Sequence, residues 1–332
     1  MRFLFINSLS TDYVEDLLFD GLTEILGKEN VISYPVNRKY YFSTACYPKN
    51  IGKCRSVFDY LEDLSAIKKK IQNKAFDAII IGSTKEDAFK YYLNLIDDLP
   101  KGMPVIYVDG GDWPEIGGDA KREHFEELFN KAASFKPFNL IFKREYIKDK
   151  DYAKNVFPFP MSFKSIHNLK MVAKKYNVTF WAVESHEIRI KAMRLLMDKY
   201  DCNDNGTILG QKFKRYKRKG LAYLSELSAS KIALNFRGVG WDTLRYWEIP
   251  GMKTFMITGH PKIVIPNNFV DREHVVYCKD DLGDLIPLID YYLQNEKERE
   301  TIAKNAQKHL SKYHTHIQRA EYFMEIVRQF LK

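Results

Sequence analysis

Residues 230–258, SKIALNFRGVGWDTLRYWEIPGMKTFMIT, contain a predicted strand, a turn, a helix and a second strand in one short stretch. The run Ile232–Phe236 is short and apolar, which is typical of a fully buried parallel strand. Gly238 and Gly240 follow it and let the backbone turn sharply or approach a ligand closely. Because open α/β sheets bind ligands at the carboxyl ends of their strands, we expect a binding site at this turn.

The helix predicted after the turn begins at Asp242 or Thr243, either of which can serve as the N-cap. Its N-terminus offers free amide groups and a partial positive charge, which suit a phosphate. Arg245 and Glu248 lie three residues apart, on one face. One interpretation is a solvated surface pair. Their apolar and aromatic neighbours favour the other, a ligand site, because an unpaired charge is costly to bury.

The rest of the chain alternates predicted strands and helices, which indicates an α/β fold with two Rossmann-like domains. In the first half we expect strands at 2–6, 31–34, 78–82, 104–109 and 139–142, and helices at 12–26, 59–71 and 86–96. In the second half we expect strands at 177–183, 232–236, 254–258 and 274–278, and helices at 187–200, 281–293, 296–312 and 315–331. The stretch 37–56 has no clean period and is interpreted as a long loop, either a lid or an acceptor surface.

The length of 332 residues favours two domains of about 150 residues each. Pro158 and Pro160 interrupt regular structure, so we place the junction just beyond them, with domains at 1–160 and 161–314. No apolar run is long enough for a membrane span, and MRFLFIN fits a first strand better than a signal peptide. The four cysteines lack CxxC spacing, which indicates reduced thiols in a cytoplasmic protein and disfavours a zinc site.

Two carboxylates stand in the Gly-rich sequence DGGDWPEIGG, at the end of a predicted strand. Asp109 or Asp112 is placed there to act as a general base on a substrate hydroxyl. The alternative is that both cap turns. A metal-binding DxD motif is disfavoured, because the sequence supplies no other obvious oxygen ligands.

Three further cations follow predicted strands or open a predicted helix. Lys143 and Arg144 follow the strand at 139–142, at its carboxyl end. They either contact a diphosphate or an acceptor, or pair with Glu145 and Asp149. Arg189 lies in the first turn of a helix, where a cation opposes the helix dipole, and we therefore expect an anionic ligand to hold it.

The net charge of +9 comes from the second half of the chain, where residues 161–332 hold 29 Lys and Arg against 19 Asp and Glu. Six of these cations lie in Gln211–Gly220, QKFKRYKRKG, with two aromatic residues among them. The segment is either a loop kept soluble by its charge or a surface for anionic lipid head groups or nucleic acid, with the protein peripheral to a membrane in the lipid case.

The stretch 230–258 resembles the C-terminal domain of GT-B glycosyltransferases, in particular the CgeB-like "glycosyl transferases group 1" set, with its SKI-x-LN, Gly turn and R-x-x-E pattern. The tail 280–327 resembles that family's tail, including an HT-x-x-x-R element. YVDGGDWPEI, LIFKREY and VFPFPMSF resemble corresponding parts of the N-terminal half. The resemblance implies two Rossmann-like domains that face a cleft, and a last helix, 315–332, that returns to the N-terminal domain.

The resemblance also implies a reaction: metal-independent transfer of a sugar from a nucleotide-sugar donor to an acceptor hydroxyl, without a cofactor. Glu248 would bind the ribose, as the last Glu of the E-x7-E pattern does, and Asp112 or Asp109 would be the base. The other residues expected at the donor are Arg245, Arg237, Gly238, Gly240, Thr243 and Arg189. Gly240 stands where many relatives have the first Glu, and Lys253 where Gly is common, so the stereochemistry and the donor stay open.

The sequence is compatible with three functions. The first is synthesis of a surface polysaccharide or glycoconjugate, with a glycan, lipid or protein as acceptor. The second is glycosylation of a modified base in nucleic acid, with residues 211–220 following the phosphates. The third is a non-catalytic nucleotide-binding scaffold, since fold alone does not fix function.

Overall fold

The computed structural model describes residues 1–37, 47–48, 63–165, 172–202, 210 and 220–331. The chain divides into two compact units. The first comprises residues 1–44, 48–162 and 316–332, and the second comprises residues 45–47 and 163–315. Most of the predicted loop at 37–56 and nearly all of the basic segment 211–220 lie outside the described residues. Within those residues, no helix combines the length and the apolar character that a membrane crossing requires.

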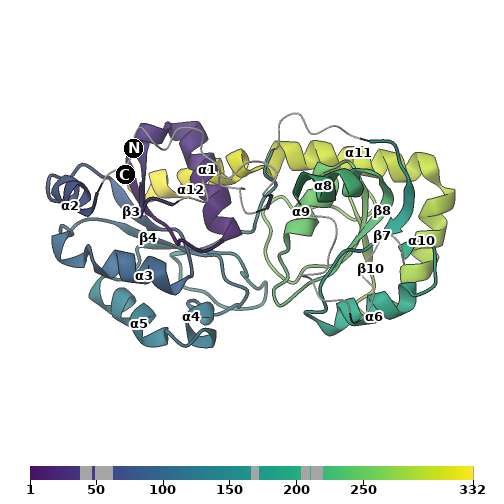
Figure 1. Cartoon of the computed structure of the whole chain (residues 1–332), viewed down its shortest axis with the longest axis horizontal. Coiled ribbons are helices and arrows are strands. Elements are labelled where there is room, and N and C mark those ends of the chain that lie inside the picture. Colours follow the sequence, from purple (N-terminus) through teal and green to yellow (C-terminus); the bar gives the residue numbers. More distant parts are fainter. Residues whose placement is uncertain (38–46, 49–62, 166–171, 203–209, 211–219, 332) are drawn as a thin grey trace. The chain divides into compact units, whose positions relative to one another are not determined.

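The first unit is built on a six-stranded parallel sheet in the order β2-β1-β3-β4-β5-β6 (Figure 1). Its strands are β1 (Phe3–Ile6), β2 (Val31–Tyr34), β3 (Ala78–Ile81), β4 (Val105–Asp109), β5 (Leu140–Lys143) and β6 (Val156–Pro158). Its helices are α1 (Tyr13–Leu26), α2 (Leu64–Gln72), α3 (Glu86–Leu93), α4 (Gly118–Arg122), α5 (Glu126–Phe135) and α12 (His316–Phe330), with 3₁₀ turns η1 (Lys28–Asn30) and η5 (Ile96–Asp98).

Alternate residues of the strands pack on opposite faces of this sheet, as the period of two requires. On one face, Ile79 and Tyr107 belong to a core that includes Phe89 of α3 and Phe129 of α5. On the other face, the ring of Phe5 lies 5.2 Å from that of Phe19 in α1. Helices therefore cover both faces, which is the Rossmann-like arrangement predicted from the alternating pattern.

The last helix belongs to the first unit, where α12 packs against α1 (Figure 1). Its Phe323 ring lies 4.4 Å from Phe142 of β5. The prediction that the C-terminal helix returns to the N-terminal domain is thus confirmed. Asp12 is the N-cap of α1, and its side chain accepts hydrogen bonds from Val14 N and Glu15 N. Gly27, with φ 83°, is the C-cap.

The second unit contains a four-stranded parallel sheet in the order β10-β9-β8-β7. Its strands are β7 (Tyr176–Thr179), β8 (Ser230–Asn235), β9 (Phe255–Gly259) and β10 (Val276–Cys278). Its helices are α6 (Glu187–Leu196), α8 (Gly220–Ser228), α9 (Leu244–Gly251), α10 (Leu285–Gln294) and α11 (Glu296–Tyr313). One face of the sheet packs on α6 and α10 through a buried cluster that includes Leu234, Leu196 and Ile289.

Strand β6 was not predicted from the sequence. Pro158, which was expected to interrupt regular structure, is the last residue of this strand, and β6 pairs with β5 at the edge of the sheet. An edge strand tolerates proline because its missing N–H leaves no ladder position empty. The helices α4, α5 and α8 were not predicted.

Candidate functional site

The turn between β8 and α9 is shaped by close contacts in the second unit. Gly238 N donates to Gly240 O at 3.0 Å. A Cβ at Gly238 would lie 3.1 Å from Arg189 Nη2 and 3.1 Å from Ser185 Oγ, so the turn leaves little room for a side chain there. At Gly238, a position predicted to permit a close approach, the backbone lies close to the protein's own side chains.

Arg189 anchors this turn. Its side chain is buried, and it donates through Nε to Phe236 O at 3.1 Å and through Nη1 to Ser185 Oγ at 3.0 Å and Val183 O at 3.2 Å. These partners belong to the segments that follow β7 and β8. Arg189 was expected to be held by an anionic ligand; the structure gives it carbonyl and hydroxyl partners from the protein, and contact with a ligand stays a prediction.

Arg237 and His186 also lie at this edge of the sheet. The guanidinium of Arg237 lies 4.2 Å from the centroid of the Trp241 ring and donates to Val239 O at 2.6 Å. His186 caps α6, because its Nδ1 accepts from Ile188 N at 3.2 Å. Burial, followed by the charge of Arg237, lowers the pKa of His186. Arg237 is partly exposed and therefore open to a ligand.

Thr243 occupies the N-cap position of α9 but makes no cap hydrogen bond with its side chain. Its Oγ1 donates instead to Asn235 Oδ1 at 2.8 Å, and Asn235 Oδ1 also lies 3.5 Å from Arg245 Nη1. Asn235 donates in turn to Thr258 Oγ1 at 3.1 Å. The last residue of β8 thus ties the start of α9 to the neighbouring strand β9. Asn235 was not singled out in the sequence, although it stands in the SKI-x-LN pattern.

Glu248 is almost completely buried, with 4% of its surface exposed. Two phenols donate to its carboxylate: Tyr47 to Oε1, and Tyr223 of α8 to Oε2 at 3.1 Å. Burial raises the pKa of Glu248, and the hydrogen bond from Tyr47, the charge of Arg245 and the hydrogen bond from Tyr223 oppose this. Neither tyrosine was predicted, because no local pattern links them to a residue so distant in the chain.

In the first unit, Asp109 and Lys143 form a buried ion pair. Asp109 ends β4 and Lys143 ends β5, in directly paired register, and Lys143 Nζ lies 2.9 Å from Asp109 Oδ1. Both side chains are at most 1% exposed. Asp109 Oδ2 also accepts from Gly117 N at 2.9 Å. The pair thus fixes the Gly-rich loop, and neither charge reaches solvent.

Asp112 lies in a different environment, since 48% of its side chain is exposed. Its carboxylate accepts from Arg144 Nη2, and Arg144 also donates to Gly110 O at 2.7 Å. The backbone N–H of Asp112 donates to Asp119 Oδ1 at 3.2 Å. Burial, followed by the charge of Asp109, raises the pKa of Asp119. Of the two carboxylates predicted as bases, Asp112 is therefore the accessible one.

In the second unit, the structure brings the donor-site candidates together at the carboxyl edge of the sheet. In the first unit, it brings the two candidate bases together at the carboxyl edge of the other sheet. Among the described residues, Asp20, Glu24 and His316 form a group of three side chains that could hold a metal ion. The Asp109–Asp112 loop is not part of such a group in that portion of the chain.

A known protein family and solved structures resemble this chain in sequence or in fold. Residues 189–325 match the family model described as "Glycosyl transferase-like", which confirms the resemblance and the enzyme class for this domain. A search of curated proteins found no match. Among solved structures, HepE of Anabaena in complex with UDP-glucose aligns with a TM-score of 0.56 at 10% identity, covering 99% of this chain and 100% of that chain.

Two further structures align over almost the full length. Sucrose-phosphate synthase of Thermosynechococcus elongatus has a TM-score of 0.56 at 10% identity, covering 99% of each chain. An alpha-glucosyltransferase in complex with UDP and a mismatched 13-mer DNA has a TM-score of 0.58 at 11% identity, covering 100% of this chain and 99% of that chain. At such identities the likeness establishes the shared GT-B fold.

Proposed function

We propose that this glycosyltransferase transfers a sugar from a UDP-sugar to an acceptor hydroxyl. Two of the structural neighbours are described with UDP or UDP-glucose bound, and they share the fold across the whole chain. The glycosyl transferase-like match at 189–325 includes the whole β8-turn-α9 segment. Both findings support a donor site at the carboxyl edge of the second sheet.

This proposal rests mainly on the burial and the hydrogen bonds of the Glu248 carboxylate. A buried acidic group is costly unless hydrogen-bond donors surround it, and here two hydroxyls already donate to it. The ribose of a nucleotide presents hydroxyls of the same kind. Glu248 would accept from them, with Tyr223 holding the other carboxylate oxygen in place.

The leaving diphosphate requires positive charge, because negative charge grows on it in the transition state. Arg245 and Arg237, both partly exposed, supply this charge. The N-terminus of α9, whose N-cap Thr243 makes no side-chain cap bond, adds free amide dipoles. In this scheme Arg189 acts indirectly, by holding the turn with Gly238 and Gly240 in shape. Lys143, paired with Asp109, does not contact the diphosphate, and Arg144 serves to orient Asp112.

Asp112 is our proposed base, because its carboxylate is half-exposed while that of Asp109 is sealed in an ion pair. A base must reach the acceptor hydroxyl to take its proton. We expect Asp112→Asn to lower kcat at least a hundredfold, in the range usual for a lost general base, and to leave the affinity for UDP unchanged.

Isothermal titration with UDP, GDP, ADP and CMP, each with and without its sugar, tests the donor assignment. We expect UDP and one UDP-sugar to bind, and Glu248→Gln to weaken both at least tenfold, as loss of a charge-assisted hydrogen bond does. Glu300→Gln, an exposed carboxylate on α11, is the control. Equal affinity in Glu248→Gln and wild type would contradict the site, and preference for another nucleotide would contradict the donor.

A second candidate acceptor is nucleic acid. Gln211–Gly220 holds six cations, and one neighbour of the same fold is described in complex with DNA. If the acceptor is DNA, binding to a duplex should weaken steeply with salt, and replacing the six cations with Gln should flatten that dependence. Binding that does not change with salt would leave a glycan, lipid or protein acceptor.

A further inference from the structure

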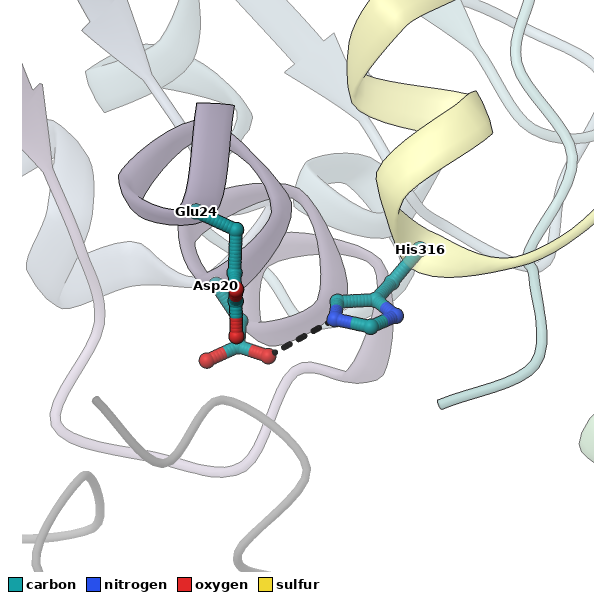
Figure 2. A group of neighbouring side chains, drawn as sticks. All are labelled: Asp20, Glu24 and His316. Carbon is teal, nitrogen blue, oxygen red and sulfur yellow. Dashed lines mark ion pairs between the residues drawn. The ribbon is translucent and has the colours of Figure 1, made fainter. Parts of the chain in front are cut away.

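Three potential metal ligands converge between α1 and α12 in the first unit (Figure 2). Asp20 and Glu24 lie one turn apart on α1, and His316 is the first residue of α12. One ligand atom from each lies within 4.8 Å of the other two. Asp20 and His316 are buried, and Glu24 is exposed.

The spacing of these atoms suits one shared ion. His316 Nε2 lies 3.2 Å from Asp20 Oδ2. Two ligands that bind one ion at about 2.1 Å, at tetrahedral or octahedral angles, are themselves about 3.0 to 3.4 Å apart. The two other distances in the group, which involve Glu24, are at most 4.8 Å, and the exposed Glu24 side chain can turn toward the ion without disturbing the core. The positions observed therefore require only a small adjustment.

The charges also favour a cation at this place. Acidic side chains four residues apart on a helix repel each other, and Asp20 and Glu24 stand in this relation. Asp16, one turn earlier on α1, is also completely buried.

We propose that Asp20, Glu24 and His316 bind a divalent transition-metal ion of the Zn²⁺ or Mn²⁺ type. One imidazole and two carboxylates suit these ions better than Ca²⁺ or Mg²⁺, which prefer oxygen ligands throughout. Because the ligands come from both helices, the ion would join the end of the chain to its first helix. The site lies within the first unit and is independent of the nucleotide.

Metal binding to the full-length protein, stripped with chelator and then titrated with Zn²⁺ without nucleotide, tests this proposal. We expect one equivalent to bind, a rise in the melting temperature, and in the Co²⁺ form a visible absorption band typical of nitrogen and oxygen ligands. Glu24→Gln should weaken Zn²⁺ at least tenfold. This variant is informative because Glu24 is exposed and its loss should not impair folding.

Two controls separate this site from other imidazoles and carboxylates. His309→Gln removes a histidine of the second unit, and Glu127→Gln removes an exposed carboxylate of α5. Both should bind Zn²⁺ as the wild type does. If the stripped protein binds no equivalent, or if Glu24→Gln binds as tightly as the wild type, the proposal fails and Asp20–His316 is an ion pair alone. Neither outcome depends on whether UDP binds.

Discussion

The hydroxyl of Tyr223 lies 3.1 Å from Oε2 of Glu248, so a residue of α8 fixes the buried carboxylate of α9. Tyr223 is in turn packed by Trp181, whose ring lies 6.0 Å away in an edge-on arrangement. These three residues come from separate segments of the second unit. The orientation of Glu248 thus depends on packing outside its own helix, and this dependence can be measured.

Tyr223→Phe should weaken UDP binding and move its pH dependence. The pKa of Glu248 is already raised by burial, and the hydrogen bond from Tyr223 opposes that shift. Removing the hydroxyl therefore raises the pKa further. In the proposed donor site the ionised carboxylate accepts from the ribose, so affinity for UDP should fall as the pH is lowered through this pKa. The midpoint should lie at higher pH in the variant.

Titration of UDP at several pH values, in wild type and Tyr223→Phe, measures both effects. At pH 7.5 we expect a loss of about 1 kcal/mol in binding, the usual worth of one hydrogen bond. Tyr291→Phe removes an exposed phenol of α10 and is the control. An unchanged pH midpoint in Tyr223→Phe would show that Tyr223 does not influence the titrating group.

Asp109→Asn should destabilise the first unit strongly, because it leaves Lys143 as a buried cation without its counterion. Breaking one partner of a buried pair costs about 3 to 5 kcal/mol. The double variant Asp109→Asn with Lys143→Met should recover much of this loss, since the buried charge is then gone. Urea unfolding followed by circular dichroism measures it.

Asp112→Asn is the matched control for this prediction, because it changes a half-exposed carboxylate of the same loop. Its effect on stability should stay below about 1 kcal/mol, because Asp112 is half-exposed and Arg144 keeps its contacts with Gly110 O and Glu145. Equal destabilisation by the two variants would argue that Asp109 is not held as the structure indicates.

The Rossmann-like fold could be predicted because local sequence patterns specify most of its strands and helices. Buried runs such as Ala78–Ile81 are too short and too apolar to be anything but inner strands, and Asp12 and Gly27 mark the two ends of α1. The helix α8 was missed, since it starts next to a highly basic segment and has only a weak apolar stripe. Strand β6 was missed because it is short and ends in a proline.

The candidate site was predictable only where its residues share a segment. Arg245, Glu248 and the glycines of the turn stand together in the sequence, and so their proximity follows from one strand, turn and helix. The contact of Tyr223 with Glu248 and the Asp109–Lys143 pairing depend on helix packing and strand register, which no local period specifies. The burial that separates Asp109 from Asp112 is likewise a property of the folded sheet.

Gly21→Ala should separate α12 from α1. A Cβ at Gly21 would lie 2.4 Å from the backbone oxygen of His316 and 2.8 Å from Ala320 Cβ. Alanine favours a helix by about 1 kcal/mol over glycine, but relieving this overlap requires movement of a whole helix, and overpacking costs about 1 to 3 kcal/mol. We expect net destabilisation and, for the proposed metal site, weaker Zn²⁺ binding.

Gly102→Ala is the control for Gly21→Ala, because nothing lies within 4 Å of the added Cβ. It should leave the thermal unfolding of the first unit unchanged. If Gly21→Ala raises the melting temperature, the helix-propensity gain outweighs the overlap, and α12 is packed less tightly on α1 than the contacts indicate.

The second unit should lose stability in mild acid through His274. Burial, followed by the charge of His309, lowers the pKa of His274, and Glu273 opposes this only in part. As the pH falls, the unfolded chain therefore takes up the proton on His274 before the folded chain does, near the ordinary pKa of 6.5. The stability that His274 contributes is full above that pH and is lost as the pH falls toward the pKa of His274 in the folded chain. Calorimetry of wild type and His274→Gln between pH 7.5 and 5 measures the difference. We expect the slope of the unfolding free energy against pH to be smaller by up to about 1.4 kcal/mol per pH unit in the variant.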